Sequence, residues 1–228
     1  MSLKLAIWDM DGTIVDSREV ISTSMVRAFE AVGLIPPSYD ETRQIVGLAL
    51  EEACRRLAPE RTSEDTLAHL VEAYRQAFIA RRTEEDFKEP LYDGAVETLE
   101  RLANDDWLIA MATGKSRRGI DAIFSMHPLA QYFDTIHCAD DGPGKPHPAM
   151  CLEAMKKMGA EPHESLMIGD AVFDMQMGRA AGLHSLGVTW GFGTREELEA
   201  AGAHHISEAY DELNLELDRF AADPERGA

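Results

Sequence analysis

The chain has 228 residues, of which 45% are hydrophobic and 28% charged, an ordinary composition for one globular domain or a domain that carries an insertion. Acidic side chains outnumber basic ones by 41 to 22, and the net charge of −19 argues against nucleic acid or an anionic membrane as a partner. No window reaches the roughly eighteen apolar residues of a membrane span, and the N-terminal residues lack a leader pattern. We therefore expect a soluble, cytoplasmic protein.

The first predicted element is a short buried strand over residues 3–8, because this apolar run ends at a glycine turn. Helical patterns then continue from 17 to about 82. Ser17 is a candidate cap for the first helix, which runs to about residue 32. Two more helices are predicted over 49–58 and 62–82, the second with a TSED opening that offers a cap and first-turn acids.

Strands and helices alternate from about residue 90 onward. Such alternation predicts a parallel sheet that is covered by helices on both faces. A weaker helix and strand and an amphipathic tail helix end the pattern. The strands are predicted over 107–113, 133–139, 165–170 and 184–190, with helices over 116–126, 149–159 and 173–181 between them.

The helical block between the first strand and the rest of the sheet is interpreted as an insertion. The expected fold is therefore α/β: a doubly wound parallel sheet, a Rossmann-like core, with an α-helical cap domain inserted after the first strand. We expect residues 1–16 and 89–228 to form the core and residues 17–88 to form the cap.

Chemically useful side chains follow the ends of the predicted strands. The first strand ends in Asp9-Met10-Asp11, and another ends in Thr113-Gly114. Ligands of an open parallel sheet bind beyond the carboxyl ends of its strands, so these groups are expected to converge. Each short motif is weak evidence by itself, and their common placement gives them weight. Lys145 lies in the loop after a third strand, and Asp170 and Asp174 follow a fourth.

Four segments in this order, DMDGTIVDS, ATGK, GKPHP and GDAVFDM, resemble the motifs of the haloacid dehalogenase superfamily. The helical insertion resembles the cap of its phosphoglycolate phosphatase-like branch. The likeness extends from Ile7 to about Trp190. It implies a hydrolase that uses Mg²⁺ and an aspartyl-phosphate intermediate to release phosphate from a small phosphorylated metabolite.

The expected metal site follows from the carboxylates. Asp9 and Asp11 occupy alternating positions of an extended segment and therefore point the same way. With Asp170 they offer the hard oxygen ligands that Mg²⁺ prefers, and a divalent cation would neutralise the buried charges. Asp174 either joins the ligands or orients them. The resemblance implies that the main-chain carbonyl of Asp11, too, binds the metal.

The resemblance also implies a role for each motif. Asp9 is expected to attack phosphorus, and Asp11 to protonate the leaving group and then activate water. Thr113 and the amide of Gly114 are expected to hold phosphate oxygens. Lys145 is expected to neutralise charge on Asp9 and on the phosphoryl group.

Within this family, Asp11 argues against dehalogenases and phosphonatases, which lack the second aspartate. Sugar-phosphate mutases carry a His and an Arg in the cap where this chain has Ile21 and Leu50. Phosphoglycolate is the first substrate to consider, and a pyrophosphatase or a nucleotide monophosphatase remains an alternative. A receiver-type module that accepts phosphate without turnover, and a DxD glycosyltransferase, fit the motifs poorly.

The cap segment around Gly47 is expected to overhang the site and contact the leaving group, although a simple helix turn explains its sequence equally well. Arg18, Arg43 and Lys115 are candidates for contacts with a substrate anion. The simpler interpretation of each is a solvated surface charge. The sequence leaves the oligomeric state open.

Overall fold

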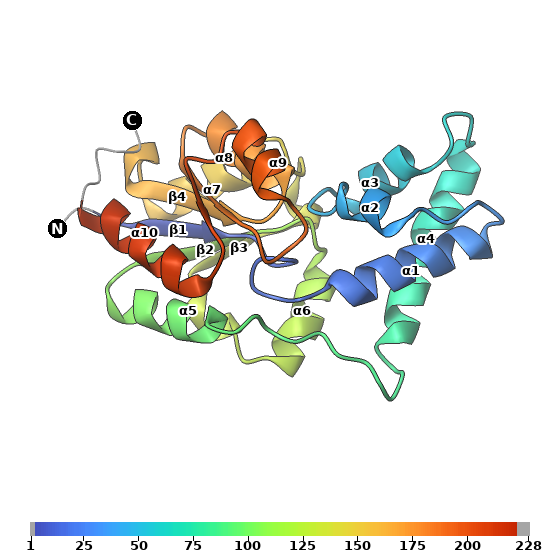
Figure 1. The fold of residues 1–228 in the computed structure, drawn as a ribbon, viewed down its shortest axis with the longest axis horizontal. Helices are drawn as coiled ribbons and strands as arrows, with labels where there is room; N and C mark the ends of the chain where they lie inside the picture. Colours follow the sequence, from blue (N-terminus) through green and yellow to red (C-terminus); the bar gives the residue numbers. More distant parts are fainter. Residues whose placement is uncertain (1–2, 223–228) are drawn as a thin grey trace.

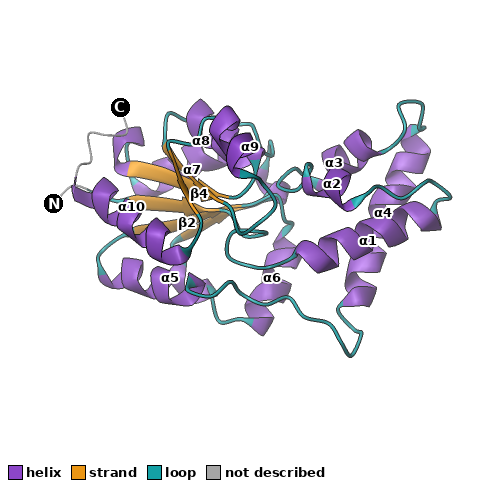
Figure 2. Cartoon of the chain, in the orientation of Figure 1, coloured by secondary structure: helices purple, strands orange, loops and turns teal. Residues whose placement is uncertain are grey.

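The computed structural model describes residues 3–222, and its centre is a sheet of six parallel strands in the order β3-β2-β1-β4-β5-β6 (Figure 2). Strand β1 (Leu5–Trp8) is central, with Leu5 in register with Leu108 on one side and Ser165 on the other. This arrangement confirms the predicted doubly wound parallel sheet. The other strands are β2 (Leu108–Ala112), β3 (Thr135–His137), β4 (Ser165–Gly169), β5 (His184–Val188) and β6 (His205–Ser207).

Helices cover both faces of the sheet, because alternate residues of each strand point to opposite faces. Trp8 of β1 faces one apolar cluster and Ile7 faces another, and both are fully buried. Figure 1 shows the two helical layers with the sheet between them. The Trp8 face is covered by α5 (Ala95–Asn104), α6 (Arg117–Met126) and α10 (Tyr210–Ala222), the Ile7 face by α7 (Ala149–Met158) and α8 (Val172–Ala180), and α9 (Arg195–Ala201) packs on α8 and β6.

The inserted helices lie together at one end of the molecule (Figure 1). They form an apolar cluster of their own, in which α1 packs along α4 and Phe29 is buried. This confirms the helical cap inserted after the first strand, whereas its boundaries at 17 and 88 stay a prediction. The cap helices are α1 (Arg18–Ala31), α2 (Tyr39–Arg43), α3 (Leu50–Leu57) and α4 (Glu64–Arg81).

The starts of α1 and α4 differ from each other in their capping. Ser63 accepts a hydrogen bond from the Thr66 amide, as the TSED pattern predicts. Ser17 occupies the predicted cap position of α1, and its carbonyl accepts a hydrogen bond from the Ile21 amide, but its side chain makes no cap hydrogen bond. Its backbone (φ −97°, ψ 9°) is not extended, as a side-chain cap bond requires, and its hydroxyl is buried without a hydrogen-bond partner among residues 3–222.

The longest helix, α4, has 18 residues and is amphipathic. Leu67, Leu70 and Val71 are buried in the cap interior, and so is the charged Arg81 at the end of the helix. Within residues 3–222, no helix combines the length and the apolar character that crossing a membrane requires.

Candidate active site

The predicted site residues converge at the carboxyl edge of the sheet. Asp9 follows the last residue of β1, Thr113 follows β2 and Asp170 follows β4. Because these three strands are adjacent and parallel, their ends lie side by side. Lys145 reaches the same place from the loop before α7, and Asp174 from the first turn of α8. The structure therefore brings four separate segments together.

A buried lysine links two of the carboxylates. Lys145 Nζ lies 2.7 Å from Asp9 Oδ1 and 2.6 Å from Asp174 Oδ1, and all three side chains are at most 1% exposed. Burial raises the pKa of Asp9 to about 7, although the charge of Lys145 opposes this shift. Burial also disfavours the charged form of Lys145, but the two carboxylates outweigh burial and raise its pKa. The second oxygen of Asp9, Oδ2, is buried and accepts no hydrogen bond from residues 3–222.

Two hydrogen bonds fix the orientation of Asp170. The Thr13 hydroxyl donates to Oδ1 at 2.9 Å, and the Phe192 amide donates to Oδ2 at 2.7 Å. Burial raises the pKa of Asp170 well above its ordinary value, and the Asp174 and Asp9 charges add to the shift. Gly12 has a φ of +84°, and a Cβ there would lie 2.2 Å from Asp170 Oδ2. Only glycine permits this approach of the first motif to the last.

The donor set fits a divalent cation. Asp9, Asp170 and Asp174 are buried and place one oxygen each within 4.8 Å of one another. When all three carboxylates are ionised, the ammonium group of Lys145 balances one of their charges and leaves two negative charges unbalanced. An unbalanced buried charge of this size is costly, and a divalent cation such as Mg²⁺ would neutralise it.

The side chain of Asp11 stands apart from this carboxylate cluster. Its Oδ1 lies 3.0 Å from Lys115 Nζ, and both side chains are largely buried, at 12% and 8% exposed. Lys115 also lies 4.0 Å from Glu89, a fully buried carboxylate that pairs with Arg82 at 2.8 Å. Lys115 is therefore a buried partner of Asp11, and its interpretation as a solvated surface charge is wrong.

The loop that holds Thr113 and Gly114 touches the cap. Thr113 is 1% exposed, and its hydroxyl accepts a hydrogen bond from the Lys115 amide at 3.2 Å. A Cβ on Gly114 would lie 2.5 Å from the carbonyl oxygen of Gly47. Gly47 itself has a φ of +97°, which glycine adopts without strain. The cap segment expected to overhang the site thus lies directly against the loop expected to bind phosphate.

The other two candidate cations lie elsewhere. Arg18 pairs with Asp16 at 2.7 Å, and Arg43 pairs with Glu197 at 2.8 Å. The second pair joins α2 of the cap to α9 of the core. Neither arginine lines the cavity described next.

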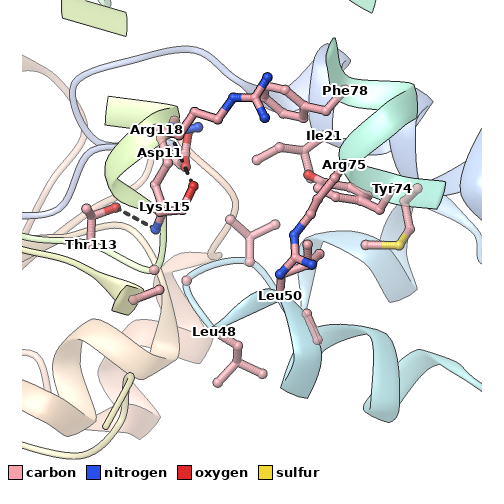
Figure 3. Close-up of a pocket in the computed structure, with 18 of the residues that line it drawn as sticks. Asp11, Ile21, Leu48, Leu50, Tyr74, Arg75, Phe78, Thr113, Lys115 and Arg118 are labelled. Carbon is pink, nitrogen blue, oxygen red and sulfur yellow. Dashed lines mark hydrogen bonds and ion pairs between the residues drawn. The ribbon is translucent and has the colours of Figure 1, made fainter. Parts of the chain in front are cut away.

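A cavity of about 600 Å³ lies between the core and the cap (Figure 3). Asp9, Asp11, Thr113 and Gly114 form part of its core side. Its cap side is lined by side chains from α1, the segment around Gly47, α3 and α4. The two positions where mutases carry a His and an Arg, Ile21 and Leu50, both line this cavity.

Sequence reasoning missed several residues of the site. Glu89 has no motif around it, and its burial beside Lys115 depends on where the chain leaves the cap. Tyr74 and Phe78 belong to an ordinary amphipathic helix, in which aromatic residues at i and i+4 are typical of core packing. No local signal distinguishes them from the cap core residues.

Comparisons with known proteins agree with the motifs. The family model described as haloacid dehalogenase-like hydrolase matches residues 6–188. The chain is 30% identical to "Probable phosphatase IndB" of Dickeya dadantii over 92% of this chain and 91% of that protein. It is also 30% identical to a phosphoglycolate phosphatase of Agrobacterium fabrum, over 82% and 81% of the two chains. The crystal structure of a hydrolase from Pseudomonas syringae matches with a TM-score of 0.82 and 28% identity, over 95% and 98% of the chains.

Proposed function

We propose that this chain, a phosphatase that belongs to the haloacid dehalogenase-like hydrolase family, hydrolyses a small phosphomonoester through an aspartyl-phosphate formed on Asp9. The observation that supports the proposal most strongly is the position of the Asp9 carboxylate and the contacts of its two oxygens. One of its oxygens contacts Lys145, while the other is buried and accepts no hydrogen bond from the described residues, and the side chain lines a cavity beside Asp11. This is a carboxylate positioned to act as a nucleophile.

In the first step, a carboxylate oxygen of Asp9 attacks phosphorus while the bond between phosphorus and the leaving oxygen breaks. Asp11 donates its proton to that oxygen, so the alcohol leaves neutral. Thr113 and the amide of Gly114 bind phosphoryl oxygens, and Lys145 offsets the negative charge between Asp9 and the phosphoryl group.

In the second step, water attacks the phosphorus of the aspartyl-phosphate. Asp11, now ionised, takes a proton from this water, and the bond between phosphorus and Asp9 breaks to release phosphate. Lys115, 3.0 Å from Asp11, orients the carboxylate for both transfers. Both proton transfers thus use one residue, which returns to its starting state.

Asp9, Asp170 and Asp174 would hold the metal ion, together with the main-chain carbonyl of Asp11. Bound Mg²⁺ supplies charge neutralisation for the phosphoryl oxygens. The hydrogen bonds from Thr13 and Phe192 to Asp170 leave lone pairs free on both of its oxygens, because each carboxylate oxygen has two. Asp174 is the weakest candidate among the three ligands, because Lys145 contacts its Oδ1 at 2.6 Å and the Ala171 amide donates to its Oδ2 at 3.0 Å.

A phosphosugar mutase is the second candidate, and the cap argues against it. Ile21 and Leu50 place apolar side chains in the cavity where mutases carry a His and an Arg. Neither can exchange a proton or bind a sugar phosphate. A phospho-acceptor module without turnover is also disfavoured, because Asp11 faces the cavity as an acid and base that such a module does not need.

The cap is proposed to comprise residues 17–88, and the core residues 1–16 and 89–228. Two features support this division: the separate apolar cluster of the inserted helices, and the position of Glu89 beside Lys115 at the base of the cap. Gly47 is proposed to contact the substrate from the cap side, which its approach to Gly114 supports.

The proposal is tested by measuring phosphate release from phosphoglycolate, sugar phosphates, nucleotides and pyrophosphate. We expect turnover with Mg²⁺, its abolition by a chelator and its restoration by added Mg²⁺. Mg²⁺ is also expected to raise the melting temperature of the metal-free protein, because it neutralises the buried carboxylates. Turnover that a chelator leaves unchanged would contradict the metal assignment, and an aspartyl-phosphate that accumulates without turnover would contradict the phosphatase assignment.

A further inference from the structure

The cavity is divided into a charged side and an apolar side. The core contributes Asp9, Asp11 and Lys115, whereas most of the cap side chains that line the cavity are apolar. The charged and polar residues among the cap side chains are Glu51, Arg75, Arg82 and Thr83. At about 600 Å³ the cavity has the size of pockets that enclose drug-sized ligands, and such pockets are mostly apolar with a few polar groups. It is far larger than a phosphoryl group with a two-carbon leaving group requires. The apolar wall consists of Ile21, Met25, Ile45, Val46, Leu48, Leu50, Tyr74, Phe78 and Ile79.

Two aromatic rings dominate the part of this wall that faces the catalytic groups. Tyr74 and Phe78 lie on successive turns of α4. Their ring centroids are 5.8 Å apart, and the ring planes are inclined by 43°. The Phe78 ring centre lies 5.1 Å from Lys115 Nζ, the partner of Asp11. Figure 3 shows Ile21, Tyr74 and Phe78 pointing into the space across from Asp11 and Lys115. A leaving group on the Asp11 side of the phosphoryl group would enter this space.

All but one of the cations that line the cavity in the described residues are already paired. Lys115 is shared by Asp11 and Glu89, Arg82 pairs with Glu89, and Arg75 pairs with Glu51 at 2.5 Å. Among the described residues that line the cavity, Arg118 alone of the lysines and arginines has no ion pair, and it is exposed to solvent. A carboxylate on the leaving group would therefore compete with Asp11 and Glu89 for the buried Lys115, and the only unpaired cation within its reach in the described lining is the exposed Arg118. Burial of such a carboxylate against the apolar wall is unfavourable.

We infer that the cap wall selects an uncharged, planar leaving group, so that the substrate is the phosphate monoester of an alcohol that carries a neutral aromatic ring or base. The inference rests on the proposed phosphatase function and narrows its substrate class. Nucleoside monophosphates belong to this class, whereas phosphoglycolate and pyrophosphate do not. The ring packs against Tyr74 and Phe78, which favour offset or edge-to-face contact with another aromatic system.

The test compares three primary-alcohol esters: 2-phenylethyl phosphate has a neutral ring, ethyl phosphate has none, and phosphoglycolate has a charge and no ring. We expect kcat/KM for 2-phenylethyl phosphate to exceed that for each of the other two by about tenfold or more, as contact with two rings and apolar burial predict. A uridine or adenosine 5′-monophosphate is expected to share this advantage. Equal values, or a preference for phosphoglycolate, would overturn the inference.

Two variants test whether the Phe78 ring causes the preference for a leaving group with a ring. Phe78→Leu removes a ring but keeps an apolar side chain, and it is expected to lower the ratio of kcat/KM between 2-phenylethyl and ethyl phosphate towards one, mainly through a higher KM. Phe124→Leu removes a comparably half-buried ring that lies on α6 outside the cavity, and it should leave that ratio unchanged. The same loss in both variants, or none in Phe78→Leu, would overturn the assignment to the cap wall.

Binding measurements distinguish a failure of this inference from a failure of the proposed phosphatase function. Calorimetric titration of the Asp9→Asn protein with the three esters measures ring preference without turnover. If no ester is hydrolysed by the unchanged protein, the phosphatase proposal fails, and tighter binding of 2-phenylethyl phosphate still supports the selectivity of the wall. Binding of all three with the same dissociation constant would overturn that selectivity.

Discussion

The core side of the cavity and the cap use charge in different ways. In the core, Lys145 and Lys115 are at most 8% exposed and each contacts two carboxylates. In the cap, ion pairs such as Arg55–Glu64 join neighbouring helices at the surface, with side chains 51% and 77% exposed. Arg81 at the end of α4 differs, because its side chain is 7% exposed and pairs with Glu19, Glu84 and Asp86. The cap is held together instead by an apolar cluster in which Phe29 and Leu70 are buried.

This difference indicates what each region contributes. Buried, paired charges stabilise a fold little compared with apolar packing, and they are kept where charge is needed for chemistry. Exposed pairs are screened by water and salt, so they tolerate change. The core side is therefore expected to be sensitive to single changes of charge, and the cap to changes of shape.

The largest effect is expected for Asp9→Asn, which removes the nucleophile. Turnover should fall by at least about a thousandfold, as loss of a covalent catalyst does in other enzymes. The fold should remain, because Lys145 keeps Asp174 as its partner and one buried charge is removed. Phosphate release and a thermal melt measure the two quantities, with Asp121→Asn at an exposed position of α6 as the control. Substantial turnover by Asp9→Asn would show that Asp9 is not the nucleophile.

A strong effect on stability is expected for Lys145→Met. The change leaves Asp9 and Asp174 buried without their shared cation, and breaking a buried pair in this way costs about 3–5 kcal/mol. Urea unfolding of the metal-free protein measures the loss, and Lys156→Met, at a position 76% exposed, is the control. Adding Asp9→Asn to Lys145→Met should recover part of the loss. A loss below about 1 kcal/mol for Lys145→Met would contradict the contrast drawn between core and cap.

The smallest effect is expected for Arg55→Ala in the cap. Its exposed pair with Glu64 should contribute less than about 1 kcal/mol to the free energy of unfolding, and less again in high salt. Phosphate release should be unchanged, because Arg55 does not line the cavity. Urea unfolding at low and high salt measures the effect. A loss of about 2 kcal/mol or more would show that surface charge holds the cap together.

Local patterns predicted most of the fold, because strand and helix periodicity depend on near neighbours. The central strand, the alternation after residue 90 and the inserted helices all agree with the structure. The side-chain cap bond of Ser17 is the exception: Ser63 and Ser17 are the same residue type, but the backbone of Ser63 is extended and that of Ser17 is not.

By itself, the sequence determined which chemical groups the protein has and at which strand ends they stand: Asp9, Asp11, Thr113, Lys145 and Asp170. Only the tertiary structure decided their partners. Lys115 is joined to Asp11 across more than a hundred residues, and Glu89 to Lys115 where the cap returns to the core. Likewise, only the tertiary structure shows that Tyr74 and Phe78 line the same cavity as the catalytic groups. The physical reason is that such contacts depend on how separate elements pack, and no periodicity within one element specifies that.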